Sequence, residues 1–162
     1  MDGLKIGTLI CCFISLVLLV IALATPNWVE AADYAGLWRG CNYTVCYSFG
    51  MQVASYVHAT RALLIIGLIF GIVSFIDLCA SFCHTYFGSS TWTKVTSKAS
   101  FFAGLAVLAA MGAFTGGYFV SSILVATQLG WSYGLGWAPG LLFLVIDGLI
   151  RRIHTRHTRQ PV

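Results

Sequence analysis

Four long apolar runs alternate with polar intervals along the chain. Two of them cover residues 6–24 and 62–82, and an uncharged stretch from 100 to 146 is long enough for two more. Because a helix rises about 1.5 Å per residue, about 20 residues cross the ~30 Å hydrocarbon core of a bilayer. The pattern therefore predicts transmembrane helices at about 6–24, 62–82, 99–120 and 131–150. The short connections predict an up-down bundle.

The longest polar interval, residues 26–60, separates the first two runs. Its short aromatic and β-branched pieces are divided by Gly36, Gly40 and Gly50 and show no convincing helical period. Such pieces predict short strands. The expected fold class is an all-α membrane protein, a single four-transmembrane-helix domain over 1–162. It carries a small extracellular antiparallel β-sheet in its first outer loop.

Two parts of this pattern are open to a second interpretation. Residues 118–125, YFVSSILV, fit either a strand or a continuation of the third helix. The first apolar run resembles a signal peptide, with Ala22-Leu23-Ala24 as a small-residue cleavage site. It is longer than the usual apolar core of about 7–15 residues, so a retained helix is predicted.

The composition agrees with a membrane protein. Hydrophobic residues make up 59% of the chain and charged residues 9%, against roughly 45–50% and about 25% in soluble proteins. The net charge of +4 comes from basic residues at the ends of the apolar runs. These basic residues form no stripe with interleaved aromatics, so nucleic acid is not an expected partner. The apolar composition makes membrane lipids the expected partner.

The basic residues predict the orientation of the four spans. Two of them, Arg39 and Arg61, would lie on one side of the membrane. Seven would lie on the other: Lys5, Lys94, Lys98, Arg151, Arg152, Arg156 and Arg159. Since basic residues are enriched in cytoplasmic loops, we expect a multi-pass plasma-membrane protein with both termini in the cytoplasm and residues 26–60 outside the cell.

Cys41 and Cys46 are the two cysteines in the polar interval. If that interval faces an oxidising compartment, they form the natural disulfide pair, with two free thiols as the alternative. The loop between them is short, so the bond would remove little unfolded-state entropy and would mainly fix a hairpin. Asn42-Tyr43-Thr44 inside the loop is an N-glycosylation sequon. Cys79 and Cys83, four residues apart at the predicted inner membrane edge, suit reversible palmitoylation.

Two acids lie within the predicted spans. Asp77 follows Arg61 by 16 residues, and Asp147 follows Trp131 by 16. At about 1.5 Å per residue, both lie about 24 Å below the outer edge, near the cytoplasmic boundary. Asp147 precedes Arg151 by four, a favourable helical ion pair, and Lys5 or Lys98 could reach Asp77. Paired acids at the membrane interface are predicted, and a proton or cation path is the alternative.

Three glycine pairs are spaced four residues apart: Gly67 and Gly71, Gly112 and Gly116, and Gly136 and Gly140. Such spacing places small residues on one helix face and allows close packing in membranes. We expect packing inside the bundle, with dimerisation as the alternative.

The outer interval resembles a known family. Trp28, then Gly36-Leu37-Trp38, then Cys41 and Cys46, then Arg61 at the mouth of the second helix resemble the claudin superfamily. That superfamily also includes the peripheral myelin, epithelial membrane and lens fibre intrinsic proteins. The four-residue gap between the cysteines and the short tail after Arg152 resemble the lens fibre and epithelial membrane branch. The resemblance implies that Arg61 fastens the outer sheet to the helices.

The residues of the outer interval favour a contact or membrane-organising role. Glu30 and Asp33 balance Arg39 and Arg61, which argues against a charge-selective paracellular pore. Four aromatics are candidate outer contacts: Tyr34, Tyr43, Tyr47 and Phe49. The alternative is that they fill the underside of the sheet or rest on lipid headgroups, which would account for at least half of them. No nucleophile–base pair, phosphate-binding glycine loop or metal-ligand cluster is visible, so neither an enzyme nor a cofactor is expected.

The predicted function is a non-enzymatic structural or adhesion protein of plasma-membrane contacts or cell junctions. It would act as a homo-oligomer or in a lateral assembly. An auxiliary subunit of a channel, receptor or vesicle membrane protein is the alternative. A transporter that uses Asp77 and Asp147 is the third candidate.

Overall fold

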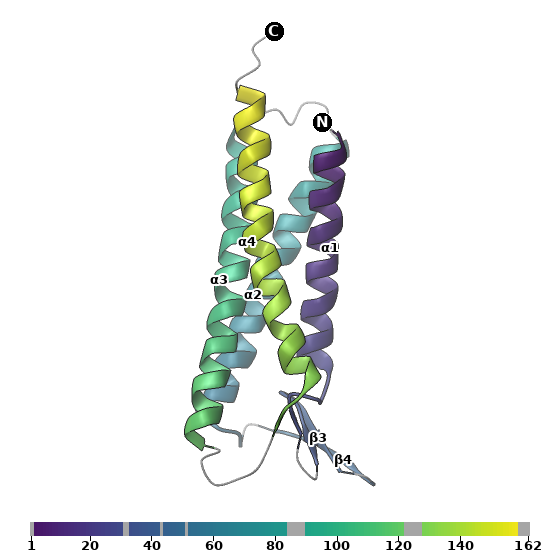
Figure 1. The fold of residues 1–162 in the computed structure, drawn as a ribbon, viewed down its shortest axis with the longest axis vertical. Helices are drawn as coiled ribbons and strands as arrows, with labels where there is room; N and C mark the ends of the chain where they lie inside the picture. Colours follow the sequence, from purple (N-terminus) through teal and green to yellow (C-terminus); the bar gives the residue numbers. More distant parts are fainter. Residues whose placement is uncertain are drawn as a thin grey trace.

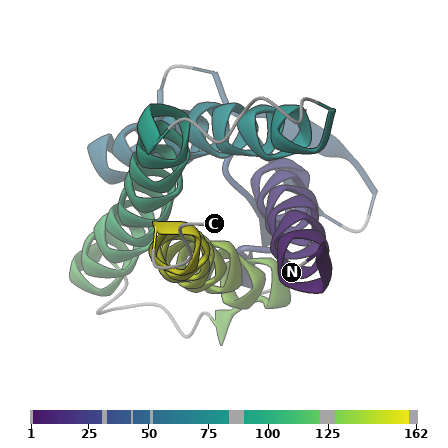
Figure 2. The same ribbon diagram turned by 90° about the horizontal axis from the view of Figure 1, so that it is seen from above.

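Four helices form the body of the protein. The computed structural model describes residues 2–30, 33–42, 44–50, 52–83, 90–121 and 128–158. In that part of the chain the helices are α1 (Asp2–Ala24), α2 (Ser55–Cys83), α3 (Ser90–Ser121) and α4 (Trp131–Thr158). Both α1 and α3 pack between α2 and α4, and the start of α1 and the end of α4 lie at the same end (Figures 1 and 2).

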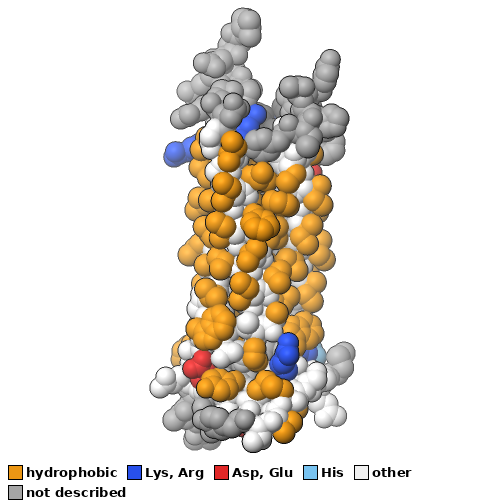
Figure 3. Space-filling view, turned by 90° about the vertical axis from the view of Figure 1, so that its right-hand side faces the viewer, with side chains coloured by type: hydrophobic (Ala, Val, Ile, Leu, Met, Phe, Trp, Pro, Cys, Tyr) orange, Lys and Arg blue, Asp and Glu red, His pale blue; other side chains and the backbone are white. Residues whose placement is uncertain are grey.

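Each helix contains a segment long and apolar enough to cross a membrane. These segments are Gly3–Ala24, Ser55–Ser81, Lys94–Val120 and Trp131–Ile153. Large hydrophobic side chains are exposed on all four helices, among them Ile10, Ile76, Leu105 and Val145. Figure 3 shows this surface as a hydrophobic band, with charged side chains at its two ends. Such a surface suits lipid as the solvent, and the predicted four-helix membrane fold is confirmed.

The helices are longer than the apolar runs that predict them. The helix α2 begins at Ser55 rather than at 62, α3 at Ser90 rather than at 99, and α4 continues to Thr158 rather than ending at 150. Hydropathy marks the part of a helix that lipid covers, whereas backbone hydrogen bonds continue beyond it. The added first turn of α2 is used in packing, because the Tyr56 ring lies edge-on to Phe114, with centroids 5.8 Å apart. Of the ambiguous piece 118–125, residues 118–121 belong to α3, and 122–127 lie outside the described residues.

The three glycine pairs differ in whether another helix packs against them. Gly67 and Gly71 face other helices, and so do Gly136 and Gly140. A Cβ placed on Gly71 would lie 2.7 Å from Phe143 Cζ and 2.9 Å from Leu16 Cδ2. Nothing lies within 4 Å of a Cβ on Gly112 or on Gly116. The expectation of packing inside the bundle is therefore wrong for this last pair, which lies on the outer surface of α3.

Gly71→Val should destabilise the protein by about 1–3 kcal/mol, because added volume at a filled contact forces the neighbouring side chains apart. The matched control is Gly112→Val, which brings the same β-branched side chain to a helix face with open space. Thermal unfolding in detergent, followed by circular dichroism, measures both variants. Equal losses at the two positions would contradict the packing described for Gly71.

Candidate functional site

A five-stranded antiparallel sheet covers one end of the helices, called here the sheet end. Its strands are β1 (Val29–Glu30), β2 (Tyr34–Ala35), β3 (Arg39–Cys41), β4 (Cys46–Ser48) and β5 (Gln128–Leu129). They follow the order β4-β3-β2-β1-β5. The first four strands lie between α1 and α2, as predicted. The strand β5, which lies between α3 and α4 and pairs with β1, was not predicted from the sequence.

The pairing register divides the sheet into two faces. Residues paired across antiparallel strands point to the same side, and neighbours along a strand point to opposite sides. One side carries Val29, Ala35, Gly40, Tyr47 and Leu129. Val29 and Leu129 pack against the helix core, so this side is called the inner face. The other side is the outer face and carries Glu30, Tyr34, Arg39, Cys41, Cys46, Ser48 and Gln128.

The candidate contact aromatics are split between these faces. Tyr34 lies on the outer face and is 38% exposed. Tyr47 lies on the inner face and is 50% exposed. The Phe49 ring packs edge-on against Tyr47, with centroids 5.5 Å apart. Tyr43 lies outside the described residues. Of the described aromatics, Tyr34 is thus the one that the sheet register directs away from the helices.

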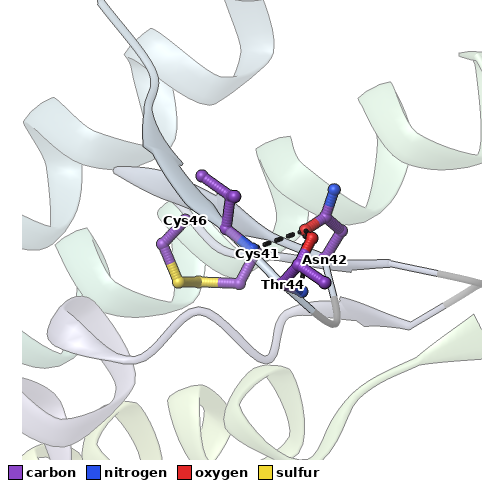
Figure 4. The surroundings of a disulfide bond; sticks show 5 residues. Cys41, Asn42, Thr44 and Cys46 are labelled. Carbon is purple, nitrogen blue, oxygen red and sulfur yellow. Dashed lines mark hydrogen bonds between the residues drawn. A yellow bond between two sulfur atoms is a disulfide. The ribbon is translucent and has the colours of Figure 1, made fainter.

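The tip of the β3–β4 hairpin is closed by a disulfide between Cys41 and Cys46 (Figure 4). The two cysteines are directly paired across the strands. Inside the loop, Asn42 Oδ1 accepts hydrogen bonds from the backbone N–H groups of Thr44, at 3.1 Å, and Val45, at 2.7 Å. Such side-chain bonds to the following backbone are typical of asparagine in tight turns. Asn42 is exposed at this tip, and its glycosylation stays a prediction.

Trp28 joins the sheet to the helices. Its side chain is fully buried, and its indole Nε1 donates a hydrogen bond to the Ala22 carbonyl at 2.7 Å. The ring lies edge-on to Phe114 of α3 and Tyr133 of α4, with centroids 4.8 and 6.1 Å apart. Trp28 therefore connects the end of α1 with two other helices directly beneath the sheet.

The Gly36-Leu37-Trp38 segment forms the second junction. Gly36 passes so close to the turn after α1 that a Cβ would lie 2.5 Å from Pro26 Cα. Leu37 is fully buried. Its carbonyl accepts hydrogen bonds from Nε of Arg61, at 2.9 Å, and from the same guanidinium's Nη2.

The Arg61 side chain completes this second junction from α2. It is 6% exposed, and its Cζ lies 4.6 Å from the centroid of the Trp38 ring, a cation–π geometry. The guanidinium is thus held by a carbonyl on one side and an aromatic face on the other. This geometry suits the fastening role that the family resemblance implies for Arg61.

The two acids lie near the opposite end of the bundle and bond to neighbouring hydroxyls of α3. Asp147 accepts a hydrogen bond from Ser97 and forms an ion pair with Arg151, with Nε and Oδ1 3.0 Å apart. Asp77 accepts a hydrogen bond from Thr96 Oγ1 at 3.5 Å. In the described part of the chain, Asp77 forms no ion pair with Lys5 or Lys98.

The hydroxyl partners of these acids were not predicted from the sequence. Thr96, Ser97 and Ser100 are buried, and Ser100 bonds to Ser74 of α2 with 2.6 Å between the two Oγ atoms. Such side chains stabilise helix contacts inside membranes. The signal that could have found them is the run of serines and threonines at the start of α3, facing acids on both neighbouring helices.

The two cysteines predicted as palmitoylation sites lie near the end of α2. Cys79 has a free, partly buried thiol near the end of α2, whereas the Cys83 side chain lies outside the described residues. Palmitoylation of either stays a prediction. No cluster of three or more His, Cys, Asp or Glu side chains gathers within the described ranges.

Comparisons with known proteins extend over most of the chain. Residues 3–151 match the family model of the PMP-22/EMP/MP20/Claudin family. Bovine lens fiber membrane intrinsic protein is 33% identical in an alignment 158 positions long, and the match covers 84% of this chain and 83% of the relative. Protein NKG7 of mouse is 30% identical in an alignment 147 positions long, and the match covers 86% of this chain and 85% of the relative.

These relatives confirm the predicted resemblance, including the lens fibre branch, whereas the similarity to Protein NKG7 was not expected. The chain belongs to the PMP-22/EMP/MP20/Claudin family.

Proposed function

We propose that this chain is a non-enzymatic structural protein of the plasma membrane that organises membrane or cell–cell contacts. The outer face of the sheet is the observation that carries this proposal. It presents Tyr34 and Arg39 as exposed side chains on a sheet that Trp28 and Arg61 fasten to the helices. A contact surface that is already fixed loses less conformational entropy when it binds.

The excess of basic residues at the opposite end supports an orientation with the sheet outside the cell. The similarity to a lens fiber membrane intrinsic protein supports a structural role in the membrane. Homo-oligomers or lateral assemblies would align many such outer faces across a contact.

Expression in non-adherent cells tests the proposal. We expect the protein to gather where two expressing cells touch, and Tyr34→Ser to reduce this enrichment several-fold at an unchanged surface amount. The matched control is Tyr47→Ser, which removes the same ring from the inner face. Diffuse protein on the surface of touching cells, or equal losses in the two variants, would contradict an adhesive outer face.

A second candidate is an auxiliary subunit of another membrane protein. The observation that favours it is the outward pair Gly112 and Gly116 on α3, which has nothing within 4 Å of either position and would let a partner helix approach closely. Diffuse surface protein that co-purifies with a channel in mild detergent would support this role, especially if Gly112→Leu removes the channel from the preparation.

Transport receives less support from the geometry. Asp147 is held by Ser97 and Arg151, and Asp77 bonds to a different hydroxyl. Each carboxylate is therefore engaged with its own partner rather than with the other acid. Replacing both aspartates with asparagine should leave proton and cation flux across proteoliposomes unchanged.

A further inference from the structure

Part of the inner face does not pack on the helices. Val29 and Leu129, which pack on the helix core, belong to β1 and β5 at one edge of the sheet. Tyr47 belongs to β4 at the other edge and is still 50% exposed, although it points to the same side. Figure 1 shows β3 and β4 extending past α1 and away from the helices. The inner face of this hairpin therefore lies to the side of the helix bundle and not against it.

The two faces of the sheet differ in charge. The paired residues of the inner face are uncharged throughout. The charged strand residues, Glu30 and Arg39, both lie on the outer face. Figure 3 shows further hydrophobic side chains at the sheet end, beyond the charged groups on that side of the molecule. An uncharged aromatic face next to lipid-covered helices suits the membrane–water interface, where tyrosine and tryptophan are enriched.

Gly40 fixes the position of the aromatic rings. A Cβ at this residue would lie 2.9 Å from Tyr47 Cζ and 3.0 Å from Phe49 Cζ. Because Gly40 has no side chain, both rings lie against β3 instead of being pushed away from it. Trp38 extends the aromatic surface towards α2, where its ring meets Arg61. Trp38, Tyr47 and Phe49 are called the aromatic shelf below.

We propose that the aromatic shelf rests on the lipid headgroup layer of the leaflet at the sheet end and holds the hairpin close to the membrane surface. The shelf continues the surface of α2, whose segment Ser55–Ser81 is apolar enough to cross the membrane. The lipid around α2 therefore lies next to the aromatic shelf even when the protein is a single copy. This contact assigns the part of the inner face that belongs to the β3–β4 hairpin to the membrane and leaves the outer face free. It does not depend on which compartment the sheet faces.

Fluorine NMR of the full-length protein in lipid nanodiscs with one copy per disc tests this contact. The probe is 4-trifluoromethyl-phenylalanine, placed at Tyr47 in one sample and at Tyr34 in the matched control. Both are tyrosines of the sheet, on opposite faces. Broadening by a lipid with a nitroxide on its headgroup should be several-fold larger at position 47 than at 34. A soluble gadolinium chelate should show the reverse order.

Equal broadening of both positions by the spin-labelled lipid would overturn the proposal, and so would stronger broadening of position 47 by the soluble chelate. A second copy of the chain is the competing occupant. If position 47 is protected from the chelate only when several copies share a disc, the shelf is a protein interface and the lipid assignment is wrong.

Discussion

Trp28→Ala should lower the free energy of unfolding by about 3–5 kcal/mol, the usual cost of truncating a large buried aromatic. The loss has two sources. The indole fills the space between Phe114 and Tyr133 beneath the sheet, and its Nε1 satisfies the carbonyl of Ala22. Thermal unfolding in detergent measures the effect, and the near-ultraviolet circular dichroism of the aromatic cluster should decrease in the folded variant.

Trp28→Phe separates the two sources. It retains an aromatic ring but leaves the Ala22 carbonyl without its donor, which costs about 1–3 kcal/mol when the group stays buried. We therefore expect an intermediate loss of stability. If Trp28→Ala unfolds at the wild-type temperature, Trp28 does not connect the sheet with the helices.

Arg61→Met should loosen the sheet while leaving the four helices in place. The change removes both donors to the Leu37 carbonyl and the cation next to Trp38. Hydrogen bonds from charged groups are worth about 1.5–3 kcal/mol, and the cation–π contact adds about 0.5–2 kcal/mol. Hydrogen exchange of the β2 and β3 amides should become faster, because the carbonyl between these strands loses its anchor.

Arg61→Lys is the control for charge. Lysine keeps the cation but lacks the planar group that reaches one carbonyl with two nitrogens. It should therefore recover part of the protection, and exchange within α3 should remain unchanged in both variants. Faster exchange in the central turns of α3 would show instead that the substitution disturbs the whole bundle.

The spans could be predicted from sequence because lipid imposes a simple rule on apolar length. The same rule misplaces the starts of α2 and α3, since a helix continues past the bilayer wherever its backbone bonds are still satisfied. Tyr56 illustrates this limit, because it lies in the added turn and packs on Phe114. Its role depends on a tertiary contact, which the hydropathy of the sequence does not indicate.

Which residues lie on which face of the sheet could not be predicted from the sequence, for a different reason. A shift of one residue in register exchanges the two sides of a strand, and strands of two or three residues carry too little alternation to fix it. Tyr34 and Tyr47 therefore look equivalent as exposed aromatics in the sequence. The pairing of Tyr34 with Cys41, and of Tyr47 with Gly40, places them on opposite faces.

The pairing of β1 with β5 has a consequence for biosynthesis. Val29 and Leu129 are neighbours in space, but the helices α2 and α3 separate them along the chain. Until the ribosome has produced the segment before α4, β1 presents an unsatisfied strand edge, which other polypeptides can join. A chain stalled at that stage would present this unpaired strand edge to folding chaperones, so completion of the sheet requires that the chain has been synthesised through β5, just before the last helix.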